Sequence, residues 1–163
     1  YLVLVHFTGG RNNVFLQKEV MVATVYVTGV WGGPMVLAWK TLVAMDWLFA
    51  VIFLLLAFTN VLYFTVFDAD SDTIDHHPTL LTRIGLRKTL RLFYALSLTT
   101  CLAACFSFFY TDLTLYKIAS LIYILMDLMM VALIFYKKTT IVGVNYRYLG
   151  EMVFWLPGLL LLG

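Results

Sequence analysis

The sequence predicts an all-α integral membrane protein, built as a polytopic bundle of transmembrane helices. Of its 163 residues, 63% are hydrophobic and only 12% are charged, and the mean hydropathy is +0.93. A soluble domain carries about a quarter charged residues. A chain this apolar would not cover its own surface in water, so the bilayer is the expected solvent. Prolines and glycines are scattered, and we expect residues 1–163 to form a single transmembrane domain.

Apolar segments of sufficient length give the expected spans. A helix that crosses the hydrocarbon core needs about 20 mostly apolar residues. Complete spans are predicted at 20–39, 41–67, 93–110 and 118–136, and part-spans at 1–8 and 148–163, about six in all. Gly32-Gly33-Pro34 predicts a kink in the first complete span. Position 1 is not Met and the chain ends in an apolar run, so we expect a fragment that lacks N-terminal helices.

The basic residues predict the orientation. With alternating spans, one side receives nine of the eleven: Arg11, Lys18, Arg83, Arg87, Lys88, Arg91, Lys137, Lys138 and Arg147. The other side receives Lys40 and Lys117. Cytoplasmic loops carry an excess of Lys and Arg. The richer side is therefore predicted to face the cytoplasm, in a bacterial inner membrane, and nothing indicates binding to nucleic acid.

An aspartate cluster on that side is the most chemically distinctive feature. Four of the nine acidic residues, Asp68, Asp70, Asp72 and Asp75, lie where the second complete span ends. If the helix continues, Asp68 and Asp72 share one face. Adjacent carboxylates repel, and Mg²⁺ relieves this well because it takes a few carboxylates and completes its shell with water and phosphate oxygens.

Basic residues follow the cluster at Arg83, Arg87, Lys88 and Arg91, and they could meet additional phosphate charge. From the residues alone, a solvated acidic loop with ordinary cytoplasmic basic residues fits equally well. A calcium loop is disfavoured because Thr73 holds the turn position where such loops require glycine.

Other acidic residues have their own interpretations. Asp127 lies mid-span, where a charge costs about 2.5–3.5 kcal/mol, so we expect it to face the bundle interior, as a cavity residue or a hydrogen-bonded structural one. A transporter that uses Asp127 as its ionisable group is one alternative function. Asp46 is expected at the interface, and Glu151 is expected to pair with Arg147 four residues earlier.

The aspartate stretch resembles the second aspartate-rich motif of the UbiA superfamily of intramembrane prenyltransferases. In that family a helix ends in D-x-x-x-D, a small hydroxyl residue follows seven positions later, and a glycine closes the segment after thirteen. Asp68-x-x-x-Asp72, Thr79 and Gly85 hold those places here, and Trp31-x-x-Pro34-Met35 is similar to the family's fifth helix. The resemblance implies that the chain covers the end of helix four through helix nine of a nine-helix fold.

The resemblance also implies a function, the Mg²⁺-dependent transfer of a polyprenyl group from its diphosphate to an aromatic or lipid acceptor. Asp68 and Asp72 would be the catalytic Mg²⁺ ligands. Substrate-binding roles would fall to Asn60, Asp70, Asp75, Arg83 and Lys88. The implied partners are a prenyl diphosphate, a hydrophobic acceptor and the lipid bilayer.

One departure from the family pattern keeps an alternative open. The family's first aspartate motif lies between its second and third helices, and this sequence contains no counterpart. The chain therefore holds at most half of a metal site. The alternative is a catalytically silent UbiA-like structural subunit, with other membrane subunits as its partners.

Overall fold

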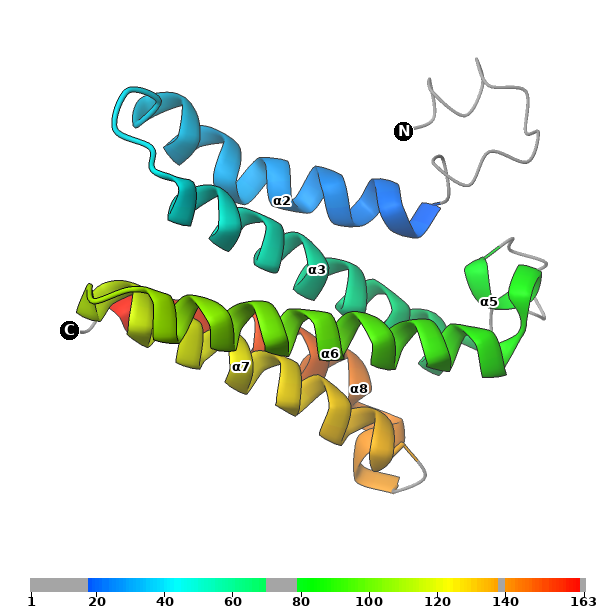
Figure 1. The fold of residues 1–163 in the computed structure, drawn as a ribbon. Helices are drawn as coiled ribbons and strands as arrows, with labels where there is room; N and C mark the ends of the chain where they lie inside the picture. The colour runs from blue at the N-terminus through cyan, green and yellow to red at the C-terminus, as the bar shows by residue number, and fades with distance from the viewer. Residues whose placement is uncertain (1–17, 70–78, 138–139, 162–163) are drawn as a thin grey trace, which may run out of the picture.

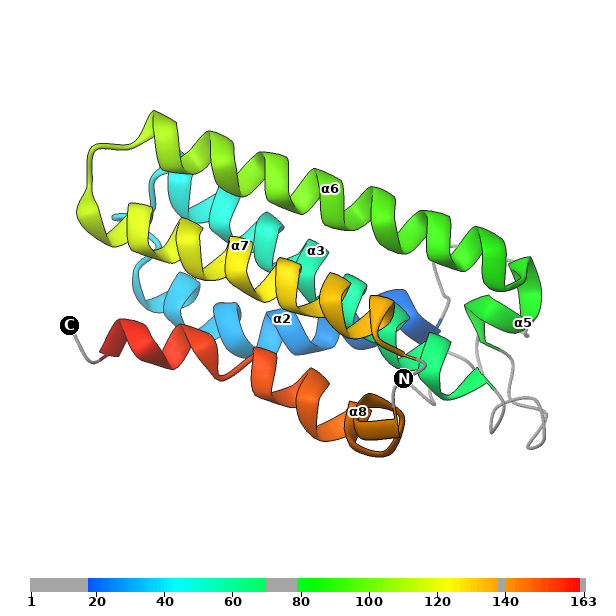
Figure 2. The ribbon, with the colours of Figure 1, turned by 90° about the horizontal axis from the view of Figure 1, so that it is seen from below.

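A computed structural model describes residues 18–69, 79–137 and 140–161. Every element in these ranges is helical, which confirms the all-α class. The helices are α2 (Lys18–Leu37), α3 (Ala44–Phe67), α5 (Leu80–Ile84), α6 (Leu86–Tyr110), α7 (Thr114–Phe135), α8 (Thr140–Val153) and the 3₁₀ helix η2 (Leu156–Leu161). The long helices lie side by side and successive ones run in opposite directions (Figures 1 and 2).

Four of the described helices, α2, α3, α6 and α7, are long and apolar enough to cross a membrane. The four predicted complete spans are therefore confirmed as helices, although several of their ends differ from the predicted ones. The α6 helix begins seven residues earlier than expected, since Arg87, Lys88 and Arg91 are good helix formers that extend the helix past its apolar part. The α2 helix includes Pro34, as the predicted span did, and ends at Leu37, two residues before the predicted end; the kink expected at Gly32-Gly33-Pro34 stays a prediction.

The α3 helix is the centre of the bundle. It packs against α2, α6, α7 and α8. In the 18-residue apolar stretch of α3, 56% is buried inside the protein, against 6% in the corresponding stretch of α2. Its fully buried side chains meet large side chains from α6 and α7. The core at this contact includes Ile52, Leu56, Leu62, Tyr63, Val66, Phe93, Met126 and Met130.

Within this hydrophobic core, hydrogen bonds between polar side chains join the helices. Asp127 is 1% exposed, which confirms its expected place inside the bundle, and its Oδ2 accepts a hydrogen bond from Ser97 Oγ at 2.7 Å. Asp46 lies at the first turn of α3. Its Oδ2 accepts from the Val43 N–H at 2.9 Å and its Oδ1 from the Tyr116 hydroxyl at 2.8 Å. Such bonds tie helices together where hydrophobic surroundings offer no other partner.

The two ends of the bundle differ in charge. The α2–α3 and α6–α7 connections lie at one end, and α5 and the last turn of α7 at the other (Figure 1). The first end carries Lys40 and Lys117; the second carries Lys18, Arg83, Arg87, Lys88, Arg91, Lys137 and Arg147. The predicted alternation of the spans is thus seen in the described helices, while the cytoplasmic orientation of the basic end stays a prediction.

Candidate functional site

Asp68 ends α3 at the basic end of the bundle. Its N–H donates to the Phe64 carbonyl at 2.8 Å as the cap of the helix, and its side chain is 24% exposed. Carboxylate Oδ1 accepts from Arg147 Nη2 at 3.0 Å and from the Tyr146 hydroxyl. The predicted carboxylate is therefore held by two side chains from α8, far along the sequence.

The Tyr146 ring is positioned by close packing of α8 on α3. It stacks on Phe67 with 4.9 Å between ring centroids and 9° between planes, and its carbonyl accepts from the Tyr63 hydroxyl at 2.8 Å. Gly150, one turn further along α8, makes this approach possible. A Cβ at Gly150 would lie 2.7 Å from the Tyr63 ring and 2.9 Å from the Phe64 ring.

Two cationic side chains, Lys137 and Arg147, contact the C-terminal end of α3. Lys137 Nζ, from the end of α7, donates to the Val66 carbonyl at 2.5 Å and lies 5.2 Å from the centre of the Phe67 ring. A cation at this position satisfies a terminal carbonyl and complements the helix dipole. Hydrogen bonds to Asp68 and Tyr146 raise the pKa of the Arg147 guanidinium above its ordinary value, so Arg147 stays charged. Two positive charges thus lie at the end of α3, one of them in direct contact with the Asp68 carboxylate.

The expected ion pair between Arg147 and Glu151 is wrong. Arg147 bonds Asp68 instead, and its Nε donates to the Tyr146 hydroxyl at 3.0 Å. The physical reason is that α8 packs with Arg147 facing the end of α3, where a second carboxylate is within reach. Glu151, on the next turn, lines a pocket.

That pocket lies between α2, α3 and the end of α8 and has a volume of about 360 Å³. It is lined by Val22, Tyr26, Ala57, Asn60, Val61, Phe64, Glu151, Phe154 and Trp155. Among the described residues, Asn60 Oδ1 is buried and has no hydrogen-bond partner. Asn60 lies eight residues before Asp68, about 12 Å along the helix axis. A mostly apolar pocket, with Glu151 and the unpaired Asn60 amide oxygen in its lining, therefore lies one turn before Asp68 along α3.

Two further motif positions have local backbone roles. Thr79 caps α5: its Oγ1 accepts from the Thr82 N–H at 3.3 Å, and its own N–H donates to Thr82 Oγ1 at 2.9 Å. Gly85 separates α5 from α6 at φ 82°, a conformation that favours glycine. The buried Glu19 holds the start of α5, because its Oε1 accepts from the Leu80 N–H at 2.5 Å.

The remaining predicted site residues are not brought together in the described structure. Asp70, Asp72 and Asp75 lie outside the described residues, so the shared face of Asp68 and Asp72 and the Mg²⁺ site stay predictions. Within the described ranges, no three His, Cys, Asp or Glu side chains form a group that could hold a metal. Arg83 and Lys88 are exposed at the same end of the bundle, and no described contact joins them to Asp68.

Tyr146, Arg147 and Lys137 are the site residues that the sequence did not indicate. The only signal was their place on the basic side of the predicted topology. Comparison of the chain with protein-family models, with curated proteins and with solved structures gives no match. The site must therefore be interpreted from its own residues.

Proposed function

We propose that this chain carries part of the active site of an integral membrane prenyltransferase that moves a polyprenyl group from its diphosphate to an aromatic or lipid acceptor. The observation that supports it best is one juxtaposition. The Asp68 carboxylate, paired with Arg147, lies at the polar end of the most buried helix, one turn beyond a mostly apolar pocket that reaches Phe64. A prenyl diphosphate has the matching form, with a charged head and an apolar tail.

The pocket supports the tail-binding half of the proposal. Its volume of about 360 Å³ falls in the range of small-molecule pockets, about 300–1,000 Å³. Its walls are mostly apolar, and two of its lining residues, Tyr26 of α2 and Phe154 just after α8, make an edge-to-face contact with 5.5 Å between ring centroids. Its polar lining includes Glu151 and the Asn60 amide, whose unpaired Oδ1 could orient a ligand.

The residues around Asp68 support the head-binding half. Mg²⁺ is commonly held by one or two carboxylates together with substrate phosphates, so Asp68, with Asp72 from outside the described ranges, is a fitting donor set. When bound, the metal would offset the charge of the departing diphosphate. Tyr146 and Arg147 fix the orientation of the Asp68 carboxylate, and the Arg147 guanidinium has further N–H groups to donate to a phosphate.

A second candidate, the catalytically silent subunit, is favoured by a different aspect of the same contact. Asp68 Oδ1 already takes an ion pair and a hydroxyl hydrogen bond from α8. In the silent subunit, this contact alone would be the role of the Asp68 carboxylate: it would join α8 to α3, and no ligand would bind. The two candidates differ in whether Mg²⁺ and a prenyl diphosphate bind at all.

The deciding experiment is a titration of the full-length protein with a prenyl diphosphate, with and without Mg²⁺. We expect Mg²⁺-dependent binding that falls at least about tenfold in Asp68→Asn and in Asp72→Asn, because each change removes a charge from the metal while keeping the side-chain shape. Asp75→Asn should have a smaller effect. Asp112→Asn, at the opposite end of the bundle, is the matched control and should bind normally. Absence of binding, or binding untouched by both changes, would favour the silent subunit.

A further inference from the structure

The first turns of α6 carry positive charge that no described side chain balances. Arg87, Lys88 and Arg91 are all exposed, and the first turn of the helix contains no acidic residue. In the described part of the chain the one ion pair is between Arg147 and Asp68, so it does not involve these residues. Cations near a helix N-terminus are also disfavoured by the helix dipole. An external anion would relieve this accumulated charge.

Arg87 and Arg91 point away from the bundle. The buried face of α6 is marked by side chains three or four residues apart, namely Thr89, Phe93, Ser97, Thr100, Ala104 and Ser107. Each residue turns the helix by about 100°, so Arg91, two positions before Phe93, lies on the opposite side. Arg87 is four residues earlier, one turn above Arg91 on the same outward face. Neither side chain therefore faces the pocket beside α3.

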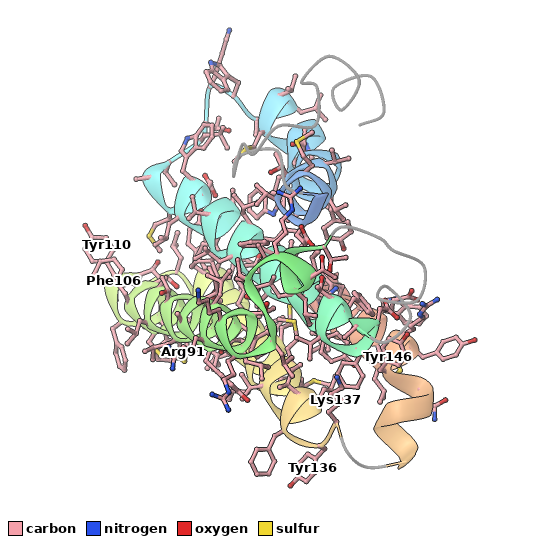
Figure 3. All side chains as sticks on the ribbon, turned by 90° about the vertical axis from the view of Figure 1, so that its right-hand side faces the viewer. Arg91, Phe106, Tyr110, Tyr136, Lys137 and Tyr146 are labelled. Atoms are coloured by element: carbon pink, nitrogen blue, oxygen red, sulfur yellow. The ribbon has the colours of Figure 1, made fainter. Side chains whose placement is uncertain are left out.

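An apolar stripe continues down the same face of α6. Leu98 and Leu102 are each 62% exposed and Phe109 is 84% exposed, and all three lie within about 20° of the Arg91 direction around the helix. Figure 3 looks along the bundle with Arg91 at the near end of α6, and Phe106 and Tyr110 project from the outer side of that helix. Two guanidinium groups thus stand at the end of an apolar stripe that the described part of the chain leaves exposed.

We propose that this outward face of α6 binds an anionic phospholipid. Arg87 and Arg91 hold the headgroup phosphate, for which their guanidinium donors are well suited, and the acyl chains lie along Leu98 and Leu102. The lipid source is favoured over free phosphate because the apolar stripe continues directly from the cations. The inference is independent of the proposed function, since it concerns the face of α6 that points away from Asp68 and the pocket.

The test is native mass spectrometry of the whole chain, released from mild detergent with phosphatidylglycerol or phosphatidylcholine added. We expect the unmutated protein to retain phosphatidylglycerol preferentially. Each cation near the surface contributes roughly fivefold to such binding. Arg91→Gln should therefore reduce the preference for phosphatidylglycerol over phosphatidylcholine about fivefold. The double change Arg87→Gln with Arg91→Gln should reduce it about tenfold or more. Lys40→Gln with Lys117→Gln, the same charge change at the other end, should retain it.

Two further arms keep the outcome interpretable. If the double glutamine variant fails to insert, Arg91→Gln alone and Arg87→Lys with Arg91→Lys answer the question, because the lysine pair keeps the charge and should keep most of the binding. Excess inorganic phosphate should not displace the lipid; displacement would assign the site to free anions and end the proposal. Equal retention of both lipids by the unmutated protein, or an equal loss in the control pair, would also overturn it.

Discussion

Asp127 shows how a single residue can be accommodated in the middle of a membrane-spanning helix. Its side chain is 1% exposed, one carboxylate oxygen accepts from the Ser97 hydroxyl, and the other has no partner among the described residues. Ser97 comes from the neighbouring α6 helix, so the bond joins two helices. An interhelical bond of this kind favours the structural role over the transporter alternative.

We expect Asp127→Asn to preserve assembly, since an amide still offers an acceptor oxygen to Ser97. Ser97→Ala should cost about 1–3 kcal/mol, because it leaves a buried acceptor with no partner. Thermal unfolding in detergent micelles measures both changes, and Thr99→Ala, on an exposed position of α6, is the control. A large, pH-dependent loss of function in Asp127→Asn with normal assembly would instead support the transporter.

The residues of the candidate site differ in how far the sequence could predict them. Asp68 and Asn60 lie on one helix, where charge spacing and depth in the span are visible in the sequence itself. Tyr146 and Arg147 meet Asp68 across 78 and 79 residues of chain. A contact of that kind leaves no local periodicity. It depends on how α8 docks, and the expected local pair with Glu151 was the wrong choice for that reason.

At the scale of elements, the α8–α3 contact determines the site. The Tyr63–Tyr146 hydrogen bond, the Phe67–Tyr146 stack and the Asp68–Arg147 ion pair follow one another along this contact. Gly150 sets the distance between the two helices, because the Tyr63 and Phe64 rings occupy the space where a side chain would begin. Small residues commonly allow such close approach between helices in membranes.

Gly150→Ala should therefore destabilise the protein by about 1–3 kcal/mol, the usual cost of overpacking. The aromatic rings it meets are stiff, so α8 must move away, and the Arg147 contact with Asp68 should weaken with it. Gly158→Ala is the matched control, since a Cβ there meets nothing within 4 Å. Thermal unfolding of the two variants gives the comparison, and an equal effect of both changes would contradict this account of the packing.

Elements were easier to predict than their ends. Length and hydropathy alone identified all four long helices, because crossing the bilayer imposes the same requirement on each. Hydropathy could not locate the start of α6, where the helix extends into a charged segment. Hydrogen bonding within the helix, rather than apolarity, decides such boundaries.

At the scale of the whole molecule, charge and burial are both unevenly distributed. Most of the basic residues lie at the end of the bundle that holds Asp68, α5 and the start of α6, where Figure 3 labels Arg91 and Lys137. The buried share of the 18-residue apolar stretch is 56% in α3, 28% in α6 and 6% in α2. The candidate site and the proposed lipid surface therefore share one membrane boundary, on different faces of the bundle.

The orientation of that boundary is the last prediction. We expect the basic end to face the cytoplasm, because nine of the eleven Lys and Arg residues fall on its side of the alternating topology. Cysteine placed at Ser71 or at Asp112, in a background with Cys101 and Cys105 replaced by alanine, gives one probe for each side. In intact cells an impermeant thiol reagent should label the Asp112 position and reach the Ser71 position only after lysis. Labelling of both positions in intact cells would contradict the alternating arrangement, and the reverse pattern would place Asp68 and its pocket on the outer side.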